Sequence, residues 1–228
     1  MSKDGLNIGN RMKRYEEVSV NYLPHRLPVI LRVDGKAFHS LTKRLFGRAW
    51  NKDMVDFMEQ TAKYVQDNIQ GCDFAYCQSD EISFLLTDYR TIRTDAWFSY
   101  NVSKMVSVSA SLASSIFSLV ADEPVQFDSR VFTLPTDEVC NYFVWRQIDA
   151  TRNAISMAAR EFYSHKELFG KNQKDMQELL YEKGINFNDY PVVRKRGFCV
   201  IRGKVEEEPP IFSKNREYVE QFVNIRED

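Results

Sequence analysis

Residues Asp73–Thr87, which read DFAYCQSDEISFLLT, contain the pattern that decides the fold. Two short runs rich in aromatic and branched apolar residues, 73–77 and 82–87, flank the polar tetrapeptide Gln78-Ser79-Asp80-Glu81. Such runs are typical of strands, and a short polar connection between two of them is typical of a hairpin. We therefore predict an antiparallel hairpin with a polar tip at 78–81.

The segments around this hairpin complete a known order of elements. Pro28–Val33 is a short apolar run that ends at an Asp-Gly pair, which predicts a buried strand followed by a turn. Apolar residues recur at helical spacing over 51–69 and 95–120, and Arg130–Leu134 predicts a further strand. The order strand, helix, strand, strand, helix, strand is that of ferredoxin-like domains. The predicted fold class is α+β, a βαββαβ antiparallel sheet with helices on one face.

After Pro135 the alternation of strand and helix patterns gives way to a mostly helical pattern. A mostly helical stretch is expected from Thr136 to about Tyr163, and another helix over 172–183. The tail carries the basic run Arg194-Lys195-Arg196. We predict a first domain over 1–135 and a mostly helical accessory region with a basic C-terminal segment over 136–228.

Composition and charge exclude several classes of protein. The 228 residues contain 31 Lys and Arg against 32 Asp and Glu, so a nucleic-acid partner would need clustered rather than excess positive charge. No stretch of 18 apolar residues and no apolar leader is visible, so we expect a cytoplasmic protein with no membrane partner. The four cysteines form no CxxC pair and fit reduced thiols. The GxGxxG, GxxxxGK[ST], GxSxG and HExxH signatures are all absent.

Two carboxylates are the strongest candidates for chemistry. Asp34 ends the first strand, and Asp80 with Glu81 lies at the hairpin tip. In a ferredoxin-like sheet the first and third strands are antiparallel neighbours, so Asp34 and Asp80 should meet at one edge. Paired carboxylates repel unless a cation lies between them, and Mg²⁺ prefers carboxylates and substrate phosphates. The alternative is structural, because Asp-Gly and Ser-Asp-Glu are also ordinary turn sequences.

Cations and polar residues near these carboxylates suggest a phosphate-bearing substrate. Lys36, His39, Lys43, Arg44 and Arg48 follow the Asp-Gly pair, where free backbone N–H groups could bind a triphosphate, and Lys104 could reach across from the second helix. For each cation alone, a solvated surface is the competing interpretation. The stretch 145–153, WRQIDATRN, is either a hydrogen-bond network between helices or a surface that faces nucleic acid.

Four motifs in this order resemble the tRNA(His) guanylyltransferase family. They are 32–39 (RVDGKAFH), 78–84 (QSDEISF), 127–131 (FDSRV) and 145–149 (WRQID). The resemblance runs from about Asn10 to Gly203. It implies that 1–135 is a polymerase-palm catalytic domain that uses two Mg²⁺, ATP, and GTP or other NTPs. It also implies nucleotide addition to the 5′ end of a tRNA in the 3′-to-5′ direction, by a homotetramer.

The same resemblance implies a role for individual residues. The catalytic residues would be Asp34, Asp80 and Glu81, and the metal ligands would be Asp34, the Gly35 carbonyl and Asp80. The nucleotide-binding residues would be Asp34, Gly35, Lys36, Ala37, Phe38, His39, Arg48, Ser79, Asp80 and Lys104. Together with the basic run, it implies that tRNA is bound by Arg130, Arg152, Asn153, Arg194 and Lys195.

One departure from the family pattern bears on the activity. Eukaryotic members carry a His-Ile-Asn-Asn type motif after the position of Asp149, whereas this chain reads Ala150-Thr151-Arg152-Asn153. The stretch is similar to the Thg1-like branch, which implies template-dependent repair of 5′-truncated tRNA. Non-templated addition of the extra guanosine to tRNA(His) is the alternative. A palm-type nucleotide cyclase and a non-catalytic tRNA-binding module are more distant alternatives.

Overall fold

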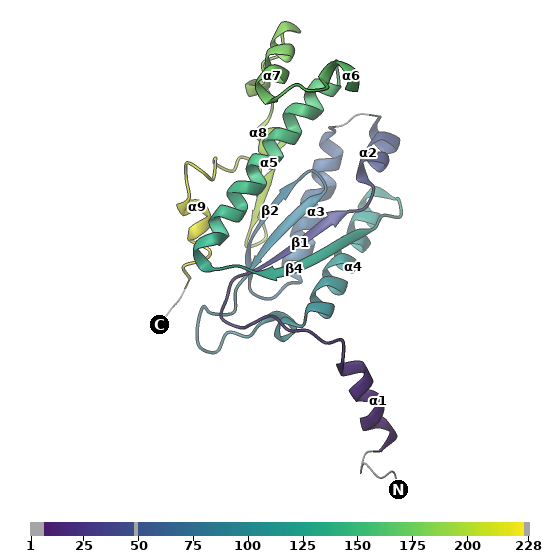
Figure 1. Cartoon of the computed structure of the whole chain (residues 1–228), viewed down its shortest axis with the longest axis vertical. Coiled ribbons are helices and arrows are strands. Elements are labelled where there is room, and N and C mark those ends of the chain that lie inside the picture. Colours follow the sequence, from purple (N-terminus) through teal and green to yellow (C-terminus); the bar gives the residue numbers. More distant parts are fainter. Residues whose placement is uncertain (1–6, 48–49, 226–228) are drawn as a thin grey trace.

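Strands β1 (Val29–Gly35) and β3 (Glu81–Leu86) are neighbours inside an antiparallel sheet. They pair from Val29 with Leu86 to Asp34 with Glu81. β4 (Phe127–Thr133) flanks β1, and β2 (Cys72–Gln78) flanks β3. The computed structural model describes residues 7–47 and 50–225, and the strand order in the six-stranded sheet is β4-β1-β3-β2-β5-β6 (Figure 1).

Alternation along β1 assigns its side chains to two cores. Val29, Leu31 and Val33 face α3 (Lys52–Asp67) and α4 (Val102–Ala121), which cover one side of the sheet. Ile30 faces the opposite side, where α5 (Val139–Arg160) packs with the C-terminal segment. All four β1 residues are fully buried. The predicted βαββαβ sheet with two helices on one face is confirmed.

Two helices differ from the sequence prediction at their starts. Residues Phe38–Phe46, for which the sequence analysis predicted no helix, form α2, which begins directly after Ala37 in a left-handed conformation (φ 60°). α4 begins at Val102 rather than near residue 95, because η1 (Trp97–Tyr100) precedes it with Phe98 at φ 51°. The Asn101 side chain then caps α4 by accepting from the Lys104 backbone N–H (3.0 Å).

The region after residue 135 shares the sheet with the first part of the chain. β5 (Phe198–Ile201) pairs with β2, and β6 (Lys204–Glu206) pairs with β5. Gly197 permits this contact, because a Cβ there would lie 2.1 Å from the Cys77 carbonyl oxygen. The remaining elements are short: η2 (Thr136–Glu138), α6 (His165–Leu168), α7 (Gln173–Glu182), η3 (Phe187–Asp189), α8 (Val192–Arg196) and α9 (Glu217–Glu220). The division into domains at residue 135 stays a prediction.

Helix α1 and the outer side of α4 are largely uncovered by the described residues. α1 (Ile8–Glu17) extends away from the sheet and has no buried residue (Figure 1). α4 is long and apolar enough to cross a membrane by length and composition, but here it packs against α3, β4 and β1. Only Met105, Ser109, Ala113 and Phe117 of α4 are buried.

A charged cluster joins α3 to the segment after β6. The Lys52 ammonium contacts Asp56 (2.8 Å), Glu207 (3.0 Å) and Glu59 (3.8 Å). Burial raises the pKa of Glu59 to about 7, with Lys52 opposing the shift and Glu207 and Asp56 adding to it. Three carboxylates thus share one ammonium group, and Glu59 is the most enclosed of them.

We predict that Glu59→Gln stabilises the protein at pH 8 and not at pH 4. The folded-state pKa of Glu59 lies above its unfolded value, so the free energy of unfolding falls as pH rises from about 4.5 to about 7. Allowing for solvent screening, the variant should gain about 1 kcal/mol at pH 8, a rise in Tm of about 2–4 °C. Melting curves at both pH values measure this, with the exposed Glu182→Gln as control. An equal shift at both pH values would contradict the assignment.

Candidate active site

The end of β1 and the tip of the β2–β3 hairpin meet at one edge of the sheet. The Gly35 backbone N–H donates to the Asp80 carbonyl oxygen (3.0 Å), and Asp34 lies opposite Glu81 in the register. Asp34 and Asp80 come together although 46 positions (80 − 34) separate them. The structure thus brings the two predicted metal-ligating carboxylates to neighbouring strand ends.

Local backbone geometry orients both carboxylates. Ser79 and Asp80 form a two-residue turn with Ser79 at φ 54°, and the Ser79 hydroxyl donates to the Asp80 carboxylate (2.9 Å). Gly35 makes room for Phe38, because a Cβ on Gly35 would lie 2.3 Å from the Phe38 ring. That ring packs on Phe117 and Phe127 at centroid distances of 5.0 Å, which places the first turn of α2 beside Asp34. Ala37 and Ser79 both adopt the left-handed conformation, which residues other than glycine rarely adopt.

The electrostatics of the edge favour a bound cation. Burial raises the pKa of Asp34, Asp128 adds to the shift, and Arg32 and Arg130 oppose it. Burial also raises the pKa of Asp80, with Ser79 opposing and Asp34 adding to the shift. Among the described residues, neither Asp34 nor Asp80 forms an ion pair with a cationic side chain, so a bound cation would favour their ionised forms.

Asp128 is a neighbour that the sequence analysis did not assign to the site. It lies opposite Asp34 in the β1–β4 register, is exposed, and contacts Arg130 (3.2 Å). Its place in the FDSRV motif, on the strand next to β1, was the available signal. In the described part of the chain, no cluster of three or more His, Cys, Asp or Glu side chains could hold a metal ion without other ligands.

Glu81, predicted as catalytic, is engaged in a buried ion pair. The Arg146 guanidinium donates to both Glu81 carboxylate oxygens (2.7 and 2.8 Å), and Arg32 lies 3.8 Å away. Arg146 also contacts Asp149 (3.3 Å). Next to it, the buried Gln147 donates to the Pro210 carbonyl oxygen and accepts from the Phe212 N–H, both at 2.9 Å. The Trp-Arg-Gln motif thus ties α5 to both the hairpin and the C-terminal segment.

A cleft of about 640 Å³ opens above the two carboxylates. α2 supplies His39, Thr42 and Lys43 to one wall, and α5 supplies Arg146, Asn153, Ser156, Met157 and Arg160 to the other. Asp34, Ser79, Asp80 and Glu81 form the floor. Phe38 is buried, so only its backbone can face a ligand. Lys36 and Ala37 are exposed just before α2.

Other residues predicted from the sequence lie elsewhere. Lys104 is in the first turn of α4, whereas Phe117, 13 residues on (117 − 104), packs on Phe38. Lys104 is not among the residues that line the cleft, and its ammonium lies 5.9 Å from the Phe98 ring centroid, so its contact with a nucleotide stays a prediction. Arg48 lies outside the described residues. Arg130 lies on the edge strand β4 and contacts Asp128.

The predicted tRNA-binding residues of the second half fall on different surfaces. Asn153 lines the cleft, whereas Arg152 and Lys195 line a separate cavity of about 420 Å³. Arg194 is paired with Glu161 (2.8 Å) and its guanidinium stacks on Tyr190 (3.7 Å). The basic run therefore does not form a single patch.

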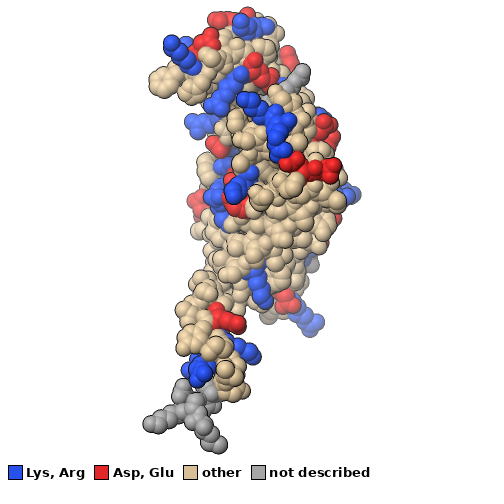
Figure 2. Space-filling view, turned by 90° about the vertical axis from the view of Figure 1, so that its right-hand side faces the viewer, with Lys and Arg blue, Asp and Glu red and all other residues tan. Residues whose placement is uncertain are grey.

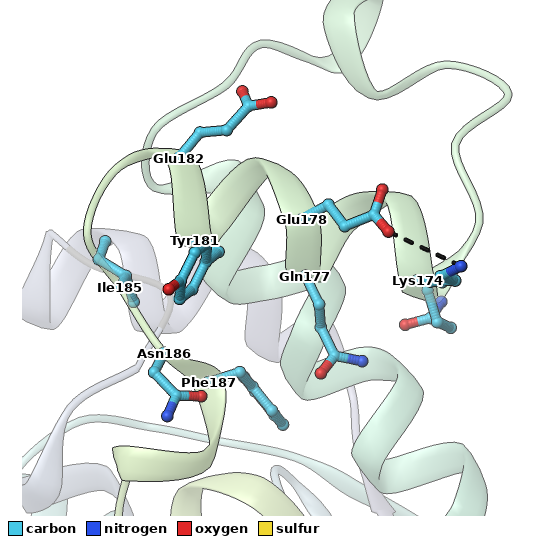
Figure 3. Close-up of a pocket in the computed structure, with 9 residues that line it drawn as sticks. Lys174, Gln177, Glu178, Tyr181, Glu182, Ile185, Asn186 and Phe187 are labelled. Carbon is cyan, nitrogen blue, oxygen red and sulfur yellow. Dashed lines mark ion pairs between the residues drawn. The ribbon is translucent and has the colours of Figure 1, made fainter.

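A wider cavity of about 740 Å³ lies between α7 and η3 (Figure 3). Its wall carries the exposed Tyr181 and the Lys174–Glu178 ion pair (3.8 Å). No residue predicted for catalysis lines it, so the cleft above Asp34 and Asp80 remains the candidate active site.

A palm-like antiparallel sheet, two carboxylates at adjacent strand ends and a cleft with basic walls together define a nucleotidyltransferase. The sequence profile of the tRNAHis guanylyltransferase family (Thg1) matches residues 9–135. The chain belongs to this family, whose members are tRNA guanylyltransferases, and the family resemblance seen in the sequence is confirmed.

Solved structures and a curated relative agree with this assignment. A bacterial tRNA(His) guanylyltransferase (Thg1)-like protein in complex with ATP superposes with a TM-score of 0.92 at 48% identity, covering 96% of this chain and 100% of that one. A GTP complex of such a protein superposes with a TM-score of 0.86 at 46% identity, covering 95% and 99%. The probable tRNA(His) guanylyltransferase of Bos taurus is 29% identical over 207 residues, 81% of this chain and 67% of that protein.

We predict that Arg146→Met destabilises the protein by about 3 kcal/mol, because it leaves the Glu81 carboxylate buried without its bidentate partner. The double variant Glu81→Gln/Arg146→Met should lose less, since no buried charge is stranded. Urea unfolding measures both. Arg44→Met, which breaks the exposed pair with Glu123, should change stability little. Equal losses for the single and double variants would contradict the role given to Arg146.

Proposed function

We propose that this protein adds nucleotides to the 5′ end of truncated tRNA in the 3′-to-5′ direction, with the opposite strand as template. ATP would activate the 5′ end, and GTP or other NTPs would be added. The observation that carries the proposal is the meeting of Asp34 and Asp80 below the first turn of α2. The alternative is non-templated guanylylation of tRNA(His), which the names of the curated relatives favour.

The donor set at this edge fits magnesium. Asp34 and Asp80 offer carboxylate oxygens, the Gly35 carbonyl lies between them in sequence, and both carboxylates have raised pKa values that a cation would lower. Mg²⁺ is commonly held by one or two carboxylates with water and substrate phosphates as the other ligands. A pair of such ions, when bound, lowers the pKa of the attacking hydroxyl and neutralises the triphosphate.

The first turn of α2 suits a triphosphate. The N–H groups of Ala37, Phe38 and His39 have no acceptor within the described chain, as expected at a helix N-terminus. Such groups, with the positive end of the helix dipole, bind phosphate. Lys36, His39 and Lys43 are exposed beside them, and none of the three takes part in an ion pair among the described residues.

The chemistry would proceed in two displacements. A 5′-phosphate oxygen of the tRNA attacks the α-phosphorus of ATP, and pyrophosphate leaves. The 3′-hydroxyl of the incoming nucleotide then attacks the activated 5′ phosphorus, AMP leaves, and the hydroxyl proton passes to water. A tRNA with a 5′-triphosphate would skip the first step. This chain contributes mainly by positioning the substrates and stabilising their charge. The reaction therefore does not require a side chain that acts as a general base.

Two observations support the templated reaction over the non-templated one. The bacterial Thg1-like structures share 46–48% identity with this chain, whereas the Bos taurus relative shares 29%. Of the stretch Ala150-Thr151-Arg152-Asn153, only Asn153 lines the cleft, and Ala150 is buried in the core. Pairing with a template would select the base, so the protein needs contacts to backbone and shape rather than to base edges.

The proposal includes a homotetramer in the cytoplasm. An isolated ten-residue helix such as α1 is marginal in water, and none of its residues is buried against the described part of the chain. The outer side of α4 carries small exposed residues, Ser103, Ser107, Ser111 and Ser115, which permit close approach of another surface. Figure 2 shows a broad, nearly uncharged area in the middle of one face, while Lys and Arg gather above it. Sedimentation velocity of the full chain tests the assembly.

The deciding experiment uses tRNA that lacks its first nucleotide, with C or A opposite the gap, together with Mg²⁺, ATP and GTP. We expect extension with GTP only opposite C. Asp34→Asn and Asp80→Asn should each lower the rate by at least about 100-fold, because the charge that binds the cation is lost. Their Tm should not fall, since burial already disfavours the ionised carboxylates.

The other outcomes have distinct meanings. Equal addition opposite C and A would establish the non-templated guanylyltransferase. No extension even of 5′-triphosphorylated tRNA would exclude the polymerase. Cyclic nucleotide formed from NTP alone would identify a cyclase, and tRNA binding without turnover would identify a binding module.

A further inference from the structure

Trp145 is a large aromatic side chain held in place at the surface. It is 52% exposed, whereas tryptophan is usually mostly buried. The Arg146 guanidinium lies 4.6 Å from the ring centroid, and Tyr142 makes an edge contact at 5.9 Å. Arg146 is itself fixed by Glu81 and Asp149. The indole ring is therefore supported by the ion pairs beneath it while half of its surface faces solvent.

The position of this ring is next to the cleft. Arg146 lines the cleft and pairs with Glu81, the residue that follows Asp80. Helical spacing puts Arg152 seven residues from Trp145 on the same side of α5, about 10 Å along the axis. Asn153 and Arg160 are spaced in the same way from Arg146 and line the cleft. An aromatic ring is thus followed by two arginines along a rigid 22-residue helix.

The two arginines carry uncompensated charge. Neither Arg152 nor Arg160 takes part in an ion pair in the described ranges, whereas Arg146 and Arg194 are both paired with carboxylates. Free guanidinium groups bind phosphate in a bidentate manner. An aromatic ring with neighbouring cations is the combination that binds single-stranded nucleic acid, through base stacking and backbone charge.

We propose that Trp145 stacks on an unpaired base of the tRNA acceptor end, and that Arg152 and Arg160 bind phosphates of the same strand. Bases inside a duplex are stacked on both faces, whereas an unpaired base can be splayed out and offers a free face to an aromatic side chain. The acceptor end of a tRNA offers such bases on its 3′ strand, beside the 5′ end. This inference rests on the proposed function in taking tRNA as the substrate, and it makes Trp145 a positioning residue.

The test compares binding of two RNAs without nucleotide, so that no turnover occurs. One is an acceptor-stem duplex with a single-stranded 3′ overhang, and the other is the same duplex with blunt ends. We expect the overhang to bind more tightly. Trp145→Leu should weaken overhang binding by about 5- to 100-fold and leave blunt binding unchanged, whereas Trp145→Phe should retain most of the affinity.

Matched variants and spectroscopy separate stacking from other effects. Tyr181→Ala removes another exposed aromatic ring, on α7 away from the cleft (Figure 3), and should change neither affinity. Tryptophan fluorescence should be quenched by the overhang RNA in the wild type and not in Trp145→Phe. Arg152→Gln and Arg160→Gln should each reduce the salt dependence of binding.

Several results would overturn the inference. One is a Trp145→Leu variant that binds the overhang RNA with wild-type affinity. Another is a Trp145→Leu variant that loses equal affinity for the overhang and the blunt RNA. The third is a change in the oligomeric state of the variant, which would show that a second copy covers Trp145. The inference and the proposed function can fail separately. Trp145-dependent overhang binding without nucleotide addition refutes only the function, and normal extension with no effect of Trp145→Leu on overhang binding refutes only the inference.

Discussion

The antiparallel pairing of β1 with β3 is the constraint on which the site depends. Val33 pairs with Ile82, both fully buried, and the next pair is Asp34 with Glu81. A slip of one residue would turn every side chain of β1 to the opposite face and carry Asp34 into the core beneath α4. The hydrophobic register therefore fixes the position of the carboxylate, and the Gly35–Asp80 backbone hydrogen bond closes the edge.

The same pairing explains why the face of the sheet under α5 changes from apolar to charged along β1. Ile30 lies in the apolar core under α5, whereas Arg32 and Asp34, two and four residues on, approach Glu81 and Arg146 on that face. Burying a carboxylate or a guanidinium without a partner costs free energy. The bidentate ion pair between Glu81 and Arg146 offsets much of that cost. Among the described residues no guanidinium pairs with Asp34 or Asp80, and burial raises the pKa of both carboxyl groups.

The parts of this fold that the sequence predicts are those with a clear local pattern. The β2–β3 hairpin and β1 follow from short apolar runs bounded by turn residues, α3 follows from helical spacing, and the meeting of Asp34 with Asp80 follows from strand adjacency. α2 was missed because it is short and begins without a capping side chain. The Glu81–Arg146 pair was missed because 65 positions separate its members, and spacing does not reveal how α5 is rotated on the sheet. The sequence also does not show which end of α4 faces the cleft, so it could not place Lys104, which is not among the residues that line it.

The rotation of α5 has a consequence for how RNA can be recognised. Its inward side, through Arg146 and Gln147, fastens the helix to the hairpin and to the C-terminal segment. Its outward side presents Trp145 and Arg152, whose side chains make no hydrogen bond or ion pair with the described residues. The inner contacts are buried and the helix is long, so α5 itself holds Trp145 and Arg152 at fixed distances from Asp34. No loop is needed to position them. A rigid surface of this kind suits an enzyme in which base pairing selects the nucleotide, since the protein then has only to hold the strands at a constant distance from the reacting phosphate.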